Sequence, residues 1–373
     1  MVHKRDLIVV GGSFAGLACA QAAAECGASV VLLDSKPDPA LRLHTTGLLV
    51  QEVMDQWDPP GHRVRPIRGV RLYAPNLQSV DLHRPGYAFW ATDTGGLLQW
   101  AAQRAAARGV QMRYGCRFVS ARPHDRRIRL DPQPWAGRFL VGADGARSRV
   151  ARTFGLETNR DFLIGLEVEM TGVRGLDPDR LHVLVDAKLA PGYIAWAFEG
   201  VGRTQIGLAV RPPAYPRIEP LLKKWQSLFD FRKARIIGRR GGQIPVGGPL
   251  NKVANERVLL IGDAAGAVSP LTAGGIHTAL QLGRLAGEAT ASWLSDPAAT
   301  HPARSVRAAT PRYRFKKLMR RAIDRPLPNG WINLAMRTGP LRALAQVIFY
   351  HHRGLLSIAG LRDAARALVT GRA

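Results

Sequence analysis

The chain has 373 residues, 46% hydrophobic and 7% aromatic, which is an ordinary composition for a globular protein of two domains or one composite domain. Three cysteines, Cys19, Cys26 and Cys116, offer no framework of paired disulfides, so a reducing cytoplasm is expected. No uncharged apolar run reaches about eighteen residues, and this excludes an integral membrane protein and a signal peptide. The net charge of +25 indicates attraction to nucleic acid, anionic lipid or a phosphorylated ligand.

The first predicted unit spans residues 6–34 and reads DLIVVGGSFAGLACAQAAAECGASVVLLD. The apolar run Leu7–Val10 predicts a buried parallel strand, and Leu17–Cys26 predicts a helix of small residues that ends at Gly27. A second strand, 29–33, precedes Asp34. This strand, glycine turn, helix and strand followed by an acid form the dinucleotide-binding pattern.

Each residue type of the turn suits a nucleotide. A glycine at the first position permits the tight turn, and the last lets helix and strand pack closely. Ser13 replaces the usual middle glycine, and its hydroxyl can donate to a phosphate oxygen. An acid about twenty residues on accepts from ribose hydroxyls, which favours FAD or NAD. The alternative is a glycine-rich unit that binds no nucleotide. The candidate residues are Gly11, Ser13, Phe14, Ala15, Gly16 and Asp34.

Two further strand-and-turn segments follow, FLVGADGARSRVAR at 139–152 and RVLLIGDAAGAVSPLTAGGIHTALQLG at 257–283. With the first motif they resemble the flavoprotein hydroxylase superfamily, which is built on the para-hydroxybenzoate hydroxylase fold. The resemblance implies FAD as the cofactor and a helix that points its N-terminus at the pyrimidine edge of the flavin. It assigns FAD contacts to Asp144, Gly145, Arg147, Gly262, Asp263, Gly274, Gly275 and Ile276.

The expected fold class is therefore α/β, with a Rossmann-like FAD-binding domain, an inserted β-rich substrate domain and a helical C-terminal region. The expected FAD-binding parts are 1–85, 95–160 and 245–300. Residues 86–94 and 161–244 are assigned to the substrate domain, and 301–373 to the basic helical region.

Within this superfamily, PLTAGGIHTAL resembles the geranylgeranyl reductase branch, and so does PGYIAWAFEGVGRTQIGLAV at 191–210. Three departures put the usual prenyl lipid substrate in doubt. Tyr193 and Trp196 are separated by two residues rather than one, and Glu199 stands where the branch has a proline. The segment LRLHTTGLLV also lacks the cysteine that the branch often carries near the flavin.

His44, Thr46, Tyr193 and Trp196 are the catalytic candidates, and Thr45 and Gly47 are further cofactor contacts. His44 is the ionisable residue of the loop predicted to meet the flavin, where it could protonate a substrate or stabilise reduced flavin. The alternatives are a surface-loop histidine and aromatic side chains that pack within a sheet. His277 is interpreted as structural, and no histidine spacing indicates a metal site.

The resemblance implies an FAD-dependent oxidoreductase that reduces a carbon–carbon double bond of an isoprenoid-like or polyketide-like substrate by hydride transfer from flavin N5. NAD(P)H or ferredoxin is the expected electron donor. The alternatives are a flavin monooxygenase using NAD(P)H and O₂, and a non-redox flavoenzyme of the lycopene cyclase kind.

The C-terminal region carries much of the positive charge, with fifteen Lys and Arg against two Asp and Glu from His301 onward. It predicts short amphipathic helices broken at 326–328, at 339–340 and at Gly354. Such helices favour peripheral binding to an anionic membrane surface by a cytoplasmic protein. Packing of this region onto the FAD domain is the alternative, and no motif indicates a specific nucleic acid.

Overall fold

The computed structural model describes residues 1–350 apart from 297, 326 and 337. These residues form two compact units. Unit 1 comprises 1–43, 94–162 and 243–318, and unit 2 comprises 44–93, 163–242 and the chain from 319 onward. In the part of the chain that the structure describes, no helix combines the length and apolarity that a membrane crossing requires.

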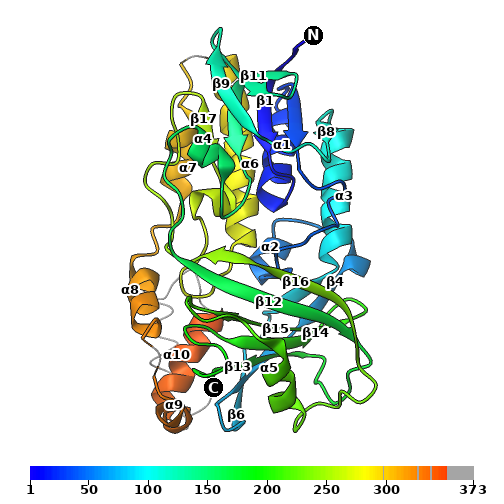
Figure 1. The fold of residues 1–373 in the computed structure, drawn as a ribbon, viewed down its shortest axis with the longest axis vertical. Helices are drawn as coiled ribbons and strands as arrows, with labels where there is room; N and C mark the ends of the chain where they lie inside the picture. The colour runs from blue at the N-terminus through cyan, green and yellow to red at the C-terminus, as the bar shows by residue number, and fades with distance from the viewer. Residues whose placement is uncertain (297, 326, 337, 351–373) are drawn as a thin grey trace. The chain divides into compact units, whose positions relative to one another are not determined.

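Unit 1 is an α/β unit (Figure 1). Its strands are β1 (His3–Val10), β2 (Val30–Leu33), β8 (Gln111–Arg113), β9 (Ser120–His124), β10 (Arg127–Asp131), β11 (Trp135–Gly142) and β17 (Val258–Leu260). Its helices are α1 (Phe14–Glu25), α3 (Thr94–Ala107), α4 (Arg149–Thr153), η2 (Gly262–Ala265), α6 (Ile276–Ser295) and α7 (Pro302–Ala309), and α8 (Arg314–Ile323) spans the division between the units.

The strands of unit 1 form one sheet in the order β8-β2-β1-β11-β10-β9, with β17 also paired to β11. β8, β2, β1, β11 and β17 run parallel, with Val10 opposite both Leu33 and Gly142, so the carboxyl ends of these strands meet at one edge. Ligands of open parallel sheets bind at that edge.

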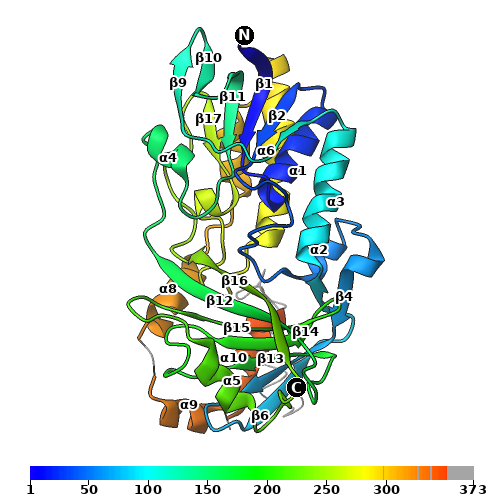
Figure 2. The same cartoon turned by 45° about the vertical axis from the view of Figure 1, so that its right-hand side comes forward.

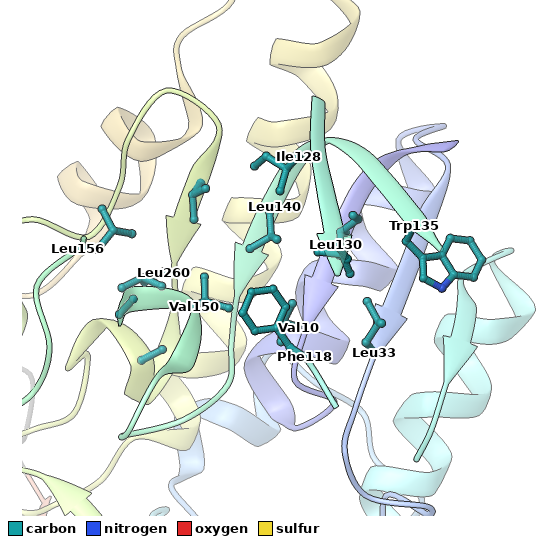
Figure 3. Packing of buried hydrophobic residues seen from close by; sticks show 14 of the residues in the cluster. Val10, Leu33, Phe118, Ile128, Leu130, Trp135, Leu140, Val150, Leu156 and Leu260 are labelled. Carbon is teal, nitrogen blue, oxygen red and sulfur yellow. The ribbon is translucent and has the colours of Figure 1, made fainter. Parts of the chain in front are cut away.

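Buried aliphatic and aromatic side chains fill one face of this sheet (Figure 3). Val10, Leu33 and Leu140 come from three adjacent parallel strands, and Val150 of α4 packs against them. Each of these side chains is at most 4% exposed. Burial of these side chains on the hydrophobic face therefore stabilises the strands that the apolar runs of the sequence predict.

Small residues bring α1 and α6 into close contact, and α1 lies between α3 and α6 (Figures 1 and 2). A Cβ atom at Gly283 would clash with the Ala15 carbonyl oxygen, and one at Gly287 would clash with that of Cys19. Cys19 is fully buried at this contact, whereas Cys26, directly after α1, is exposed. The alanine-rich sequence of α1 thus permits backbone-to-backbone packing behind the first glycine turn.

Unit 2 is rich in β-structure. Its strands are β3 (Leu48–Leu49), β4 (Val64–Ile67), β5 (Gly69–Tyr73), β6 (Ser79–His83), β7 (Phe89–Thr92), β12 (Phe162–Thr171), β13 (Arg180–Leu184), β14 (Ala195–Glu199), β15 (Thr204–Val210) and β16 (Arg235–Pro245). Its helices are α2 (Gln51–Met54), η1 (Gly61–Arg63), α5 (Ile218–Trp225), α9 (Asn329–Ala335) and α10 (Gly339–Tyr350).

Seven of these strands form a sheet in the order β16-β12-β15-β14-β13-β5-β6, and β3-β7-β4 form a smaller sheet. Both faces of the large sheet carry buried apolar side chains, and successive residues of a strand point to opposite faces. Leu184 packs in the cluster that contains Trp225 of α5, whereas Val183 packs in the cluster that contains Phe89 of β7 and Tyr350 of α10.

The fold class expected from the sequence is confirmed: a Rossmann-like domain carries an inserted β-rich domain and C-terminal helices. Two parts of the chain are placed differently. The helical region that begins at residue 301 is divided, because 301–318 cluster with unit 1 and the described residues from 319 onward cluster with unit 2. Residues 44–85, assigned from the sequence to the FAD domain, cluster with unit 2. The reason is long-range pairing, because β5 runs parallel to β13 with Gly69 opposite Arg180. The predicted break at Gly354 lies outside the described residues.

Candidate functional site

Four glycine-rich or acidic turns meet at the carboxyl edge of the parallel strands of unit 1. They follow β1, β2, β11 and β17, the strands that precede the sequence motifs. Two hydrogen bonds link the last two turns, because the Asn159 side chain donates to the carbonyl oxygens of Ala146 at 3.0 Å and Asp263 at 2.8 Å. The turns at Ala146 and Asp263, far apart in the sequence, are therefore neighbours in unit 1.

The first turn requires glycine for steric reasons. Gly11 has a φ of +106°, and a Cβ atom there would clash with the Ala143 carbonyl oxygen of the turn after β11. A Cβ atom at Gly16 would clash with the Gly11 carbonyl oxygen, which holds α1 close to the turn. Ser13 is exposed at the N-cap of α1, and its side chain makes no capping hydrogen bond. The first turn of α1 thus presents positive potential, which suits a phosphate.

Asp34 lies at the end of β2 and is 8% exposed. Its carboxylate accepts from the backbone N–H of Gly12 at 2.6 Å and from that of Lys36 at 2.7 Å. Asp34, the acid predicted to bind ribose hydroxyls, therefore holds the glycine turn in place by hydrogen bonding. A carboxylate with four lone-pair sites can accept these two bonds and still accept from a ligand.

Asp144 has a structural role that the sequence did not indicate. Its carboxylate accepts from the Ser148 hydroxyl and from the backbone N–H of Arg149 and Val150, at 2.6, 2.6 and 3.0 Å. These bonds cap the first turn of α4. Arg147 donates to the Gln243 side chain, and its guanidinium lies 6.0 Å from the centre of the Phe162 ring. Contacts of Asp144, Gly145 and Arg147 with a cofactor remain predictions.

The Gly-Asp turn after β17 holds the half-buried carboxylate of Asp263. Burial raises the pKa of Asp263 to about 6, and among the described residues no hydrogen bond to its side chain offsets the burial. Gly262 packs against α1, since a Cβ atom there would lie 2.9 Å from the Ala15 Cβ. Gly274 and Gly275 precede Ile276, the first residue of α6, whose N-terminus has no side-chain cap. A hydroxyl-bearing ligand fits Asp263, because its donors would replace the lost hydration.

Asp263→Asn is expected to stabilise the flavin-free protein at neutral pH. The folded-state pKa of about 6 exceeds the ordinary value of 3.8, so the folded protein binds the proton more readily. The resulting stabilisation is complete below the ordinary pKa and is lost as pH rises through about 6. The asparagine variant should therefore exceed wild type by roughly 2 kcal/mol in free energy of unfolding at alkaline pH, and by less in acid.

Urea unfolding of both flavin-free proteins at several pH values measures this difference. Because asparagine cannot accept as a carboxylate does, the same variant should bind FAD more weakly. An asparagine variant that is less stable than wild type at every pH would contradict this account of Asp263.

In unit 2, residues 44–47 form the loop that the sequence predicts to meet the flavin. His44 is exposed, and its Nδ1 lies 2.9 Å from the Gly241 carbonyl oxygen. The Gly47 carbonyl oxygen accepts from the buried Thr92 hydroxyl at 2.8 Å. Both ends of the loop are thus fixed to neighbouring strands of unit 2.

A buried polar network holds the middle of this loop. Arg240 donates to the carbonyl oxygens of Thr45 at 3.0 Å and Thr46 at 3.5 Å, and it pairs with the Glu169 carboxylate. Gln205 donates to the Thr46 carbonyl oxygen at 2.8 Å and to Glu167 at 2.9 Å. The side chain of Arg240 is only 8% exposed, so these bonds lie in a region of low dielectric constant, where they are strong.

Glu167 joins the network to one of the predicted catalytic residues. Trp196 Nε1 donates to Glu167 at 2.8 Å, and the indole lies over Gly207 of the next strand. Burial raises the pKa of Glu167, although hydrogen bonds from Gln205, Trp196 and Thr46 and the charge of Arg240 act to lower it. The network therefore brings Thr45, Thr46 and Trp196 together within unit 2.

Tyr193 has different neighbours. Burial raises the pKa of its hydroxyl, and the nearby Arg320 lowers it. Arg320 also donates to the Gly192 carbonyl oxygen. The aromatic residues of the predicted substrate motif therefore have separate surroundings: Trp196 belongs to the network that holds the loop, and Tyr193 faces a basic side chain of α8.

Sequence reasoning missed Glu167, Glu169, Gln205 and Arg240. A signal for two of them was present, because the acids of the apolar run LEVEM are two residues apart and must face the same side of a strand. Buried acids need a partner, but the sequence does not indicate that the partner is Arg240, some seventy residues away.

A family model described as an NAD(P)-binding Rossmann-like domain matches residues 9–75. Digeranylgeranylglycerophospholipid reductase 2 of Methanopyrus kandleri is 30% identical over an alignment 324 residues long, and this alignment covers 78% of this chain and 78% of that protein.

Solved structures share the fold. A geranylgeranyl bacteriochlorophyll reductase-like protein from Thermoplasma acidophilum aligns with a TM-score of 0.81 at 17% identity, covering 99% of this chain and 96% of that one. The halogenase PltM, solved in complex with phloroglucinol and FAD, aligns with a TM-score of 0.66 at 14% identity, covering 97% of this chain and 85% of that one.

Proposed function

Because the chain belongs to the geranylgeranyl reductase family, which includes the digeranylgeranylglycerophospholipid reductases, we propose that it is an FAD-dependent oxidoreductase that reduces carbon–carbon double bonds of an isoprenoid lipid. The observation that carries this proposal is the set of four turns at one sheet edge of unit 1. They provide a tight glycine turn and a helix N-terminus without a side-chain cap. They also provide the carboxylate of Asp34, which is fixed by backbone N–H groups, and that of Asp263, whose pKa is raised by burial.

These features fit FAD in chemical type. The N-terminus of α1 and the Gly11–Gly16 turn bind the pyrophosphate through backbone N–H groups. The remaining acceptor sites of Asp34 bind ribose hydroxyls. Asp263 would accept from a ribityl hydroxyl, with the Gly274–Ile276 turn at the start of α6 beside it. Asp144 holds α4 in place, and its neighbours Gly145 and Arg147 complete the site.

Reduced FAD supplies a hydride from N5, and the second hydrogen reaches the alkene as a proton. His44 provides that proton in our proposal. Its Nδ1 contact with the Gly241 carbonyl oxygen orients the ring, which leaves Nε2 for the substrate. Thr46 and Trp196 line the same region, and Thr45 and Gly47 contact the flavin. Arg240 and Gln205 keep the loop carbonyls in place.

The proposed substrate is a lipid, and NAD(P)H or ferredoxin delivers the electrons. The C-terminal helices offer a surface for peripheral binding to an anionic membrane. In α9 and the segment before it, the side chains of Leu327, Trp331 and Leu334 are 61%, 64% and 58% exposed. Exposed apolar residues next to a basic helix suit such an interface.

An anaerobic single-turnover experiment tests the proposal. Protein loaded with FAD is photoreduced and mixed with a geranylgeranylated glycerophospholipid, and the flavin absorbance is followed. We expect reoxidation together with a gain of two hydrogens for each double bond reduced. The fully saturated lipid serves as the matched control and should leave the flavin reduced. Equal reoxidation by both lipids, or by neither, would exclude the proposed reaction.

A further inference from the structure

An open groove of about 570 Å³ lies on unit 2, apart from the loop and network described above. It is formed by the connection between β6 and β7, the first residue of β13, and parts of β4 and α2. Ligand sites for small molecules usually measure about 300–1,000 Å³. The lining of the groove includes Arg68, Arg84 and Arg180 together with Pro66, Tyr87 and Trp90, and none of its described lining residues is a carboxylate.

Arg180 occupies the space left by Gly69, the residue opposite it on β5. It pairs in register with Gly69 of β5, and a Cβ atom there would lie 2.8 Å from the Arg180 Nη1. The guanidinium therefore lies across this glycine. Its Nε is buried and has no hydrogen-bond acceptor among the described residues. The nearest carboxylate in an ion pair with it, that of Asp81, is 3.9 Å away and already accepts two bonds from Arg71.

The other two arginines also retain capacity for an anion. Arg84 donates to the Tyr350 carbonyl oxygen at 2.8 Å, a neutral acceptor, so that within the described part of the chain this bond leaves the positive charge of Arg84 available to an anion. Arg68 pairs with Asp179 at 2.9 Å, but the two side chains are 63% and 47% exposed. An ion pair with that exposure contributes little stability, so a phosphate can compete for the guanidinium.

Hydrogen bonds hold the two aromatic side chains of the groove in place. The Tyr87 hydroxyl donates to Glu52 at 3.3 Å, and Trp90 Nε1 donates to Gln51 at 2.9 Å. With their polar atoms bonded in this way, the rings offer carbon surface. The groove thus combines anion-binding arginines with a fixed apolar wall, which is the complement of an amphiphile with a negatively charged head.

We propose that this groove binds the phosphate ester group of an amphiphile and the first part of its hydrocarbon chain. Arg68, Arg84 and Arg180 contact the phosphate, and Pro66, Tyr87 and Trp90 contact the chain. The amphiphile comes either from solution as a single molecule or from a membrane as a phospholipid. The proposal depends on unit 2 alone and does not depend on the reaction proposed above.

Calorimetric titration with dodecyl phosphate below its micellar concentration tests the site on the FAD-loaded full chain. The double variant Arg68→Gln/Arg180→Gln should bind at least about tenfold more weakly than wild type, because it removes two charged donors. The matched control, Arg122→Gln/Arg129→Gln, removes two arginines that face each other on β9 and β10 of unit 1, and should bind as wild type does. Inorganic phosphate should bind wild type much more weakly than dodecyl phosphate, since it lacks the chain.

Co-sedimentation with phosphatidylglycerol vesicles identifies the source. Weaker sedimentation of the groove variant than of the control supports a membrane phospholipid. Equal sedimentation together with impaired dodecyl phosphate binding supports a free amphiphile. Equal binding of dodecyl phosphate by wild type and the groove variant would overturn the proposal, and so would equal weakening in groove variant and control. Unchanged circular dichroism and thermal unfolding show that each variant is folded, and none of these readouts requires turnover.

Discussion

Gly11→Ala is expected to abolish FAD binding and to destabilise unit 1 by about 3 kcal/mol or more. Two costs combine at this position. The φ of +106° is unfavourable for any residue with a Cβ atom, and that atom would clash with the Ala143 carbonyl oxygen. This oxygen cannot easily move, because β11 pairs with β1 over the whole length of β1. The turn must therefore open, which separates the motifs after β1 and β11. FAD titration followed by flavin fluorescence measures the loss.

Gly27→Ala is the matched control. Gly27 also has a positive φ, of +85°, but a Cβ atom there would have no atom within 4 Å. Its replacement should cost only the backbone strain of about 1 kcal/mol and leave FAD affinity unchanged. Similar losses of FAD affinity in both variants would mean that strain alone, rather than the contact between the two turns, controls the site.

Arg240→Met is expected to lower the free energy of unfolding by about 3–5 kcal/mol and to reduce kcat far more than it raises KM. The variant leaves Glu169 with only the more exposed Arg203 as an ion-pair partner, and it removes the hydrogen bonds that Arg240 donates to the carbonyl oxygens of Thr45 and Thr46. Arg240→Lys keeps the charge, but its N–H donors all lie on one nitrogen and cannot reproduce the planar guanidinium. The lysine variant should therefore recover stability more fully than kcat. Chemical unfolding and steady-state kinetics measure the two effects separately.

Arg232→Met provides the control, because this arginine is 88% exposed in its ion pair with Asp230. It should change neither stability nor kinetics measurably. If Arg240→Lys restored kcat and stability to the same extent, Arg240 would be only a structural residue and would not position the loop.

The meeting of the candidate cofactor residues at one sheet edge could be predicted from the sequence because it depends on local patterns, and their contacts with FAD stay predictions. The turn after β1, Asp34 and the Gly262–Asp263 turn each follow an apolar run, and parallel strands align their carboxyl ends. The residues therefore meet without any long-range information. The capping role of Asp144 was not predicted, although its neighbours Ser148 and Arg149 follow it closely in the sequence.

The network behind the loop could not be derived in this way. Arg240 lies on β16 and its partners lie on the loop and on β12, and only the antiparallel pairing of the sheet brings them together. The different placement of residues 44–85, in unit 2 rather than with the FAD domain, has the same origin, because β5 joins β13, more than a hundred residues later. Local patterns carry no information about such pairings.

The most direct test of the account is the mass of the lipid product formed with FAD-loaded protein, chemical reductant and a geranylgeranylated glycerophospholipid, with and without air. The account predicts a product that has gained two hydrogens for each reduced double bond, formed equally well without air. A product that gains an oxygen atom, formed only in air, would contradict the account and identify a monooxygenase.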